Sequence, residues 1–70
     1  MSFKISDTTR VRPAYGRKYA TAEAAAAAWS AGSDFKMVGG PYCSNRDFVE
    51  GTIIHIFYDM YDFTTVIVGA

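Results

Sequence analysis

The chain has 70 residues, which allows one small domain and no more. Half of the residues are hydrophobic, 16% are aromatic and 20% are charged, a composition too apolar for a disordered tail. Seven basic residues balance seven acidic ones, so neither a histone-like basic protein nor a DNA-mimicking acidic protein fits the charge.

The cysteine count and the N-terminus indicate the compartment. Cys43 is the single cysteine, so it cannot form an internal disulfide, and it lacks the paired spacing of a zinc or redox site. The N-terminal sequence has no apolar run after its first lysine, and no stretch approaches the roughly 18 apolar residues of a membrane span. The sequence therefore predicts a soluble cytoplasmic protein, whose small core makes oligomerisation a common source of extra stability.

The first half of the chain is predicted to contain a strand followed by a helix. Residues 8–12 (TTRVR) form a candidate strand that a proline ends, and residues 3–5 form a weaker one. Residues 22–31 are predicted to be helical, because alanine is the best helix former and Thr21 is a good N-cap. Gly32 is placed to end this helix in the left-handed conformation that glycine adopts readily.

The second half of the chain is predicted to consist of strands joined by turns. Residues 34–38 (DFKMV) form a candidate strand, and the following Gly-Gly-Pro marks a turn. A short extended segment is predicted at residues 42–46. Residues 52–58 (TIIHIFY) and 64–68 (TTVIV) are rich in branched and aromatic side chains, and we expect them to pair antiparallel through a connection of hairpin length.

The order of these elements predicts an α+β domain. Its mostly antiparallel sheet has three to five strands, and one alanine-rich helix packs on one face of that sheet. The predicted core lies between the helix and the sheet. It consists of Trp29, Phe35, Ile54, Ile56 and either Val66 or Ile67.

Both faces of the predicted strand at residues 52–58 are apolar. Ile53, His55 and Phe57 share one face, and Ile54, Ile56 and Tyr58 lie on the other. A helix of about ten residues is roughly 15 Å long and covers only part of one face. The N-terminal arm, a second copy of the chain or another protein must therefore cover the second face. We expect for this reason that the protein does not act as an isolated monomer.

Charge is unevenly distributed along the chain. The first 20 residues carry five basic side chains against one acidic side chain, whereas residues 47–62 carry four acidic side chains and no lysine or arginine. Basic residues interleaved with tyrosines can contact phosphates and stack on bases. An acidic protein partner or simple solvation would explain the same charges, because no helix-turn-helix, zinc-finger or RNP1-like pattern accompanies them. The candidate contact residues are Arg10, Arg12, Tyr15, Arg17 and Lys18.

No residue pattern points to catalysis, to a metal or to a cofactor. His55, the only histidine, lies between two isoleucines in a predicted strand, where we expect a structural role. Asp59 and Asp62 would supply too few ligands with His55 for a metal site. Asp47 and Glu50 flank a turn, where solvation explains them. The sequence therefore predicts a protein that is not an enzyme and uses no cofactor.

The connection between the two C-terminal strands is a candidate for binding a protein. Methionine and aromatic residues are enriched in the cores of protein interfaces. In the alternative interpretation two flanking aromatic residues of this connection, Tyr58 and Phe63, fold into the core and only Tyr61 is exposed. The candidate partner-binding residues are Tyr58, Asp59, Met60, Tyr61 and Asp62.

Residues 18–38 (KYATAEAAAAAWSAGSDFKMV) combine a threonine-capped alanine helix, a glycine and an aromatic-bearing strand. In this pattern the segment resembles the short T7-type inhibitors of host RNA polymerase and, more broadly, the small accessory proteins of tailed bacteriophages. The chain differs in its long C-terminal hairpin and its lack of net acidity, so no functional residue is carried over. The resemblance implies a bacteriophage-encoded, non-enzymatic inhibitor or modulator that occludes a protein in the host cytoplasm. A small nucleic-acid-binding protein is the alternative.

Overall fold

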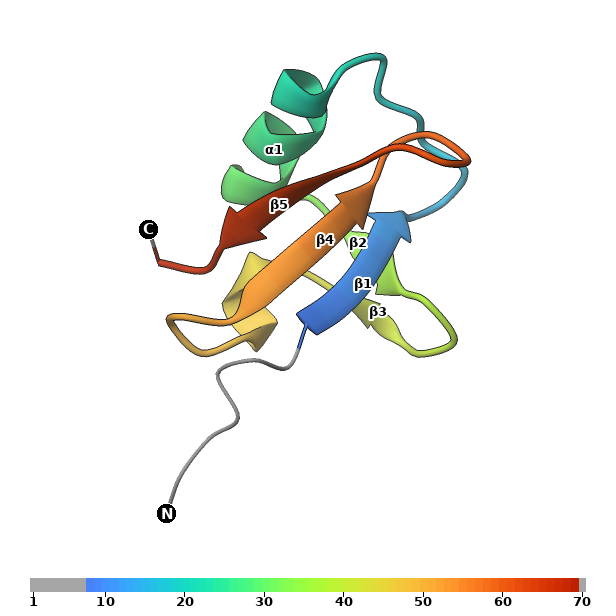
Figure 1. Cartoon of the computed structure of the whole chain (residues 1–70). Coiled ribbons are helices and arrows are strands. Elements are labelled where there is room, and N and C mark those ends of the chain that lie inside the picture. The colour runs from blue at the N-terminus through green and yellow to red at the C-terminus, as the bar shows by residue number, and fades with distance from the viewer. Residues whose placement is uncertain (1–7, 70) are drawn as a thin grey trace.

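The computed structural model describes residues 8–69 of the chain (Figure 1). One helix and a five-stranded, mostly antiparallel sheet form a small α+β domain, as predicted. The predicted strand at residues 3–5 lies outside the described residues. The elements in chain order are β1 (Thr8–Pro13), α1 (Ala22–Ser30), β2 (Phe35–Met37), β3 (Tyr42–Cys43), the 3-10 turn η1 (Asn45–Asp47), β4 (Ile53–Phe57) and β5 (Phe63–Ile67).

The strand order of the sheet is β3-β2-β1-β4-β5, so β1, the first strand of the described residues, lies at the centre. β1 pairs with β4 in parallel, with Val11 opposite Ile56, and the other neighbouring strands pair antiparallel. A parallel pair needs a long crossover connection, which residues 14–52 supply. Nothing in the local sequence pattern indicated that β1 would separate the C-terminal hairpin from β2.

The helix α1 begins at the predicted residue and ends at Ser30, one residue before the predicted end. The Thr21 hydroxyl oxygen accepts a hydrogen bond from the Ala24 N–H at 3.1 Å, which satisfies one of the free donors of the first turn. Gly32 follows the helix with φ of +84°, the expected left-handed conformation. The helix buries Ala25 and Trp29 against the sheet.

The core lies between α1 and one face of the sheet, as predicted. The Trp29 ring meets the Phe35 ring edge-on, with 5.4 Å between their centroids. Val66 packs against this cluster, whereas Ile67 is 52% exposed, so Val66 occupies the core position for which the sequence allowed either residue. The buried members of the cluster are Val11, Ala25, Trp29, Phe35, Cys43, Ile54 and Ile56.

Several predicted boundaries are wrong. β1 includes Pro13, which was expected to end it, and β2, β4 and β5 cover residues 35–37, 53–57 and 63–67. Residues 42–46 are not one extended segment, because β3 ends at Cys43 and η1 follows it. The Asp47 carboxylate accepts a hydrogen bond from the Ser44 N–H at 2.7 Å, and this contact turns the chain away from the sheet. β5 begins at Phe63 and not at residue 64, because Phe63 pairs with Phe57 across the hairpin.

Candidate functional site

The face of the sheet opposite α1 has no described helix or strand packed on it (Figure 1). Paired residues of neighbouring strands project to the same side, and successive residues along a strand alternate. The register therefore assigns every strand residue to one face. The side opposite the buried core, which we call the open face, carries Thr8, Arg10, Arg12, Lys36, Tyr42, Ile53, His55, Phe57, Phe63, Thr65 and Ile67.

The β1–β2 side of the open face is basic. Arg10 and Arg12 are exposed on the central strand, and Lys36 lies opposite Arg12 on β2. Within residues 8–69 neither arginine forms an ion pair with a carboxylate. Lys36 Nζ donates a hydrogen bond to Gly40 O at 2.9 Å and lies 6.0 Å from the centroid of the Tyr42 ring. Positive charge is therefore concentrated on this part of the sheet.

Two tyrosines stack at the β3 edge of the open face. The Tyr15 and Tyr42 ring centroids are 5.0 Å apart with 18° between the ring planes, and both rings remain more than half exposed. Tyr15 has φ of +57°, a left-handed conformation that is uncommon for any residue but glycine. The Arg17 guanidinium lies 5.7 Å from the Tyr15 ring centroid. The loop after β1 thus brings Tyr15 and Arg17 to the basic side of the sheet.

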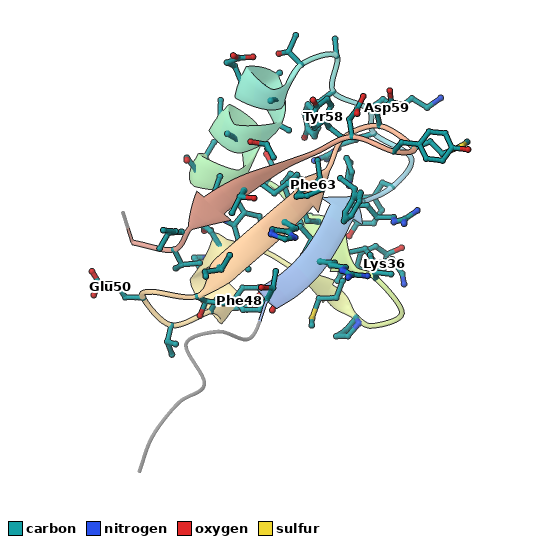
Figure 2. The ribbon with its side chains drawn as sticks, viewed as in Figure 1. Lys36, Phe48, Glu50, Tyr58, Asp59 and Phe63 are labelled. Carbon is teal, nitrogen blue, oxygen red and sulfur yellow. The ribbon has the colours of Figure 1, made fainter. Side chains whose placement is uncertain are left out.

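The β4–β5 side of the open face is aromatic. The Phe63 ring centroid lies 4.6 Å from that of His55 and 5.0 Å from that of Phe57. Phe63 is 46% exposed, and Figure 2 shows it beside the two C-terminal strands. His55 lies opposite Arg10 in the parallel pairing of β1 with β4. The aromatic and basic halves therefore meet in the middle of the open face.

A hollow of about 340 Å³ adjoins the open face near the ends of β1 and β4. Arg12, Arg17 and Lys18 contribute positive charge to its lining, and Phe57 contributes an aromatic wall. Asp59 is its single acidic residue. Three cations against one carboxylate suit a bound anion such as a phosphate group. The structure thus brings together three of the basic residues that the sequence singled out.

The strand positions of the open face include no acidic residue in the described part of the chain. Asp47 and Glu50 lie in the connection between β3 and β4, and Asp59 and Asp62 lie in the turn between β4 and β5. The chain has no net charge, yet within residues 8–69 the strand positions of the open face carry basic side chains and no acidic ones. The open face is consequently positive.

The residues predicted to bind a protein occupy the turn between β4 and β5. Met60 and Tyr61 are 78% and 84% exposed, and the Asp59 carboxylate accepts a hydrogen bond from the Met60 N–H at 2.7 Å. Tyr58 packs against the core instead. The interpretation in which only Tyr61 is exposed is wrong, because Met60 and Phe63 are exposed as well.

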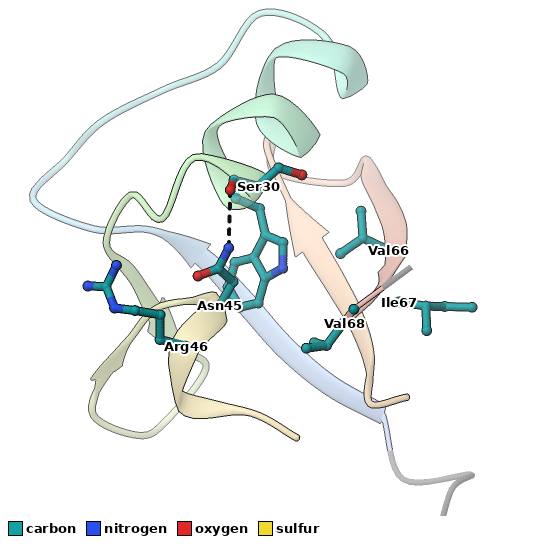
Figure 3. Close-up of a pocket in the computed structure, with 8 residues that line it drawn as sticks. Ser30, Asn45, Arg46, Val66, Ile67 and Val68 are labelled. Carbon is teal, nitrogen blue, oxygen red and sulfur yellow. Dashed lines mark hydrogen bonds between the residues drawn. The ribbon is translucent and has the colours of Figure 1, made fainter. Parts of the chain in front are cut away.

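A second hollow of about 710 Å³ lies between the end of α1 and the end of β5 (Figure 3). Trp29, Ser30, Asn45, Arg46 and residues 66–69 line it. Asn45 Nδ2 donates a hydrogen bond to Ser30 O at 3.2 Å, which ties η1 to the end of the helix. Arg46 is the one charged side chain of this lining, so the hollow brings no pair of acid–base groups together. Among residues 8–69 no three His, Cys, Asp or Glu side chains are grouped to hold a metal ion.

Cys43 is buried in the core, as expected of a small apolar side chain. Burial raises the pKa of the Cys43 thiol, and the negative charge of Asp47 raises it further. The thiolate is the form that attacks electrophiles and binds metals, and both burial and the raised pKa disfavour it at Cys43. This geometry gives Cys43 a packing role.

Comparison with known protein families, characterised proteins and solved structures finds no match. Within residues 8–69 the structure contains no helix with the length and apolar character of a membrane span. The open face is therefore the feature from which a function can be argued.

Five residues of the basic and aromatic halves of this candidate site were not predicted to be functional. They are Lys36, Tyr42, His55, Phe57 and Phe63, and they join the predicted Arg10 and Arg12 because β2 and β4 pair with β1, β3 pairs with β2, and β5 pairs with β4. The alternation along residues 52–58 already placed Phe57 with His55. The missing information was which strands are neighbours, which a local pattern does not contain.

Proposed function

We propose that the chain binds single-stranded nucleic acid on its open face. The observation that carries the proposal is the juxtaposition, on one uncovered sheet face, of the arginines of β1 with the ring cluster of β4 and β5. Proteins that bind single strands combine a positive surface for the phosphates with aromatic rings on which bases stack. Both components are present here within neighbouring strands.

The charge arrangement supports a polyanionic ligand. Arg12 and Lys36 lie directly opposite each other, and like charges at such positions destabilise a sheet. Lys36 Nζ is held by Gly40 O beside the Tyr42 ring, and Arg12 has no carboxylate partner within residues 8–69, so both groups leave positive charge on this face without a counter-charge. A phosphate backbone lying across β1 and β2 would neutralise that charge. The basic hollow of Arg12, Arg17 and Lys18 continues the same positive surface.

The shape of the site supports a single strand and not a duplex. Side chains read duplex DNA mainly from a helix or a two-stranded ribbon inserted into the major groove. The helix α1 has no basic residue in its last turn, and it packs on the other side of the sheet. Exposed rings on a flat face need unstacked bases, which loops and single strands provide.

The proposal is tested by fluorescence anisotropy with labelled oligothymidine and oligouridine, and with a duplex of the same length. We expect both single strands to bind at low salt and the duplex to bind more weakly. Arg10→Gln and Arg12→Gln should each weaken binding and lower the slope of log K against log salt, by about 0.7 for each phosphate that the variant no longer neutralises. Arg46→Gln is the matched control, because Arg46 lines the other hollow and should leave binding unchanged.

Stacking is tested separately. Phe63→Ala should weaken binding about tenfold with little change in the salt slope, because stacking on one base contributes about 1–3 kcal/mol. Tyr61→Ala removes an aromatic ring that is 84% exposed in the turn, and it should leave binding unchanged. Absence of single-strand binding at low salt, or equal weakening in the control variants, would contradict the proposal.

Binding of a protein by the turn between β4 and β5 is the second candidate function. The observation that favours it is the exposure of Met60 and Tyr61, at 78% and 84%. The more specific idea of a bacteriophage-type inhibitor depends on the resemblance of residues 18–38 alone. Under this alternative Met60→Asp and Tyr61→Ala abolish capture of one defined partner, whereas Arg10→Gln and Arg12→Gln leave it intact.

A further inference from the structure

The outer edge of β5 is unpaired within residues 8–69, because β5 ends the strand order of the sheet. Natural edge strands are commonly protected by a charged residue, a proline or a bulge. The five residues of β5 (FTTVI) include no charge and no proline, and they pair with β4 without a break in register. α1 packs against β5 from the core side, and β5 itself has no charge, proline or bulge that would prevent another strand from adding to its outer edge.

The backbone groups that face outward can be identified from the hydrogen bonds at the two ends of the hairpin. The Tyr58 N–H donates to Asp62 O, and the Val68 N–H donates to Thr52 O. Hydrogen-bonded pairs alternate along an antiparallel ladder. Residues 62, 64, 66 and 68 therefore bond to the β4 side, and Phe63, Thr65 and Ile67 direct their N–H and C=O groups outward.

These three residues are arranged symmetrically about Thr65. In an antiparallel pairing of two β5 strands centred there, Thr65 lies opposite Thr65 of the other copy, and Phe63 lies opposite Ile67. Both side chains project from the open face and are about half exposed, at 46% and 52%. Aromatic and branched side chains paired across strands stabilise a sheet by about 0.2–1 kcal/mol each. The same register satisfies the outward backbone groups and pairs the exposed apolar side chains.

We infer that β5 is a self-association edge, and that its partner is a second copy of this chain related by a twofold axis through Thr65. The inference does not depend on nucleic-acid binding. An unrelated extended strand could use the same backbone groups, but a second β5 is the partner for which this chain itself supplies matching side chains, Ile67 opposite Phe63 and Phe63 opposite Ile67. The contact is one strand wide and smaller than a standard interface of about 1,600 Å², so we expect a weak, reversible dimer.

Sedimentation equilibrium tests the inference. The expected result is a concentration-dependent shift toward twice the mass of one chain, 7.7 kDa. Thr65→Pro removes the central outward N–H and should yield a monomer, because proline is tolerated on an edge strand where that N–H is free. Thr65→Val keeps the N–H and is the matched control, which should still dimerise. A wild-type chain that stays monomeric up to millimolar concentration would overturn the inference and leave the edge to a foreign strand.

A crosslinking experiment tests the register and does not depend on the proline variant folding. In a Cys43→Ala background, Thr65→Cys should form a disulfide dimer on mild oxidation, because opposite residues in a hydrogen-bonded pair have Cα atoms about 5.5 Å apart and disulfides span about 4.4–6.8 Å. Ile67→Cys should not, because residue 67 lies opposite Phe63 of the other copy. Equal crosslinking at both positions, or at neither, would overturn the twofold register.

Discussion

Arg12 is the residue at which the two basic regions of the molecule join. Its side chain belongs to the open face, where it lies opposite Lys36, and it also lines the smaller hollow with Arg17 and Lys18. A guanidinium can hold a phosphate through two hydrogen bonds in a fixed geometry, whereas an ammonium group acts as a point charge. A phosphate chain that crosses β1 can therefore continue into the hollow without leaving positive surface.

The complete burial of Ile56 leads to a prediction about the stability of the domain. Its side chain is fully buried beside Val11 at the centre of the sheet. Ile56→Ala is expected to cost about 2–5 kcal/mol of unfolding free energy, which is close to the whole stability of so small a domain. Urea unfolding measures the change, and Ile67→Ala is the control, because half of the Ile67 side chain is exposed already. Equal costs for the two variants would contradict the assignment of the core.

Cys43 carries a prediction about reactivity and pH. Because burial and the Asp47 charge raise its pKa, the folded protein should react with iodoacetamide at pH 7 far more slowly than the unfolded chain. Because the pKa of Cys43 is higher in the folded state, its contribution to the unfolding free energy is fully present below the unfolded pKa of about 8.5. This contribution is lost as the pH rises through the folded pKa. Cys43→Ala should remove this alkaline loss. Rapid modification of the folded protein would contradict the prediction.

The capping of α1 can be tested at the scale of one element. Thr21→Ala leaves the N–H of Ala24 without its side-chain acceptor, so we expect a loss of about 0.5–2 kcal/mol in unfolding free energy. Thr21→Ser retains the hydroxyl and should restore most of the stability. Thermal unfolding followed by circular dichroism measures both variants. If the alanine and serine variants melt together, the hydrogen bond does not contribute.

Elements governed by local chemistry could be predicted from the sequence. The alanine run and Thr21 predicted α1, and the branched run at residues 52–58 predicted β4 and its two faces. The sequence did not show whether Val66 or Ile67 lies in the core, and the register of β5 with β4 is what distinguishes them. The predicted core residues Phe35 and Ile54 followed from the same alternation. Local pattern was therefore sufficient for the elements and most of the core.

The arrangement of those elements could not be predicted in the same way. Neighbouring strands in sequence usually pair, yet β1 lies between β2 and β4 and is parallel to β4. That placement depends on long-range packing, which a window of adjacent residues does not contain. The candidate site was the feature least predictable from the sequence, because its basic half comes from β1 and β2 and its aromatic half comes from β4 and β5. The segment of η1 was also missed, since the Asp47 contact to Ser44 competes with an extended backbone.

The whole molecule is neutral but its charges are segregated. The basic side chains of β1, β2 and the following loop gather on and beside the open face, whereas acidic residues flank β4 in its two connections. The molecule therefore has an electric dipole moment although its net charge is zero. In the twofold pairing of β5 the two open faces continue one another, so the aromatic clusters of the two copies adjoin and the basic regions lie outside them.

The folding pathway is constrained by the central position of β1. The hairpin of β4 and β5 and the pair of β2 and β3 close short loops, whereas Val11 meets Ile56 across about 45 residues of chain. Bringing such distant segments together costs roughly 3 kcal/mol of loop-closure entropy before any contact compensates for it. We therefore expect the contact between β1 and β4 to form late in folding and to limit its rate, because the core is incomplete until these two strands have met.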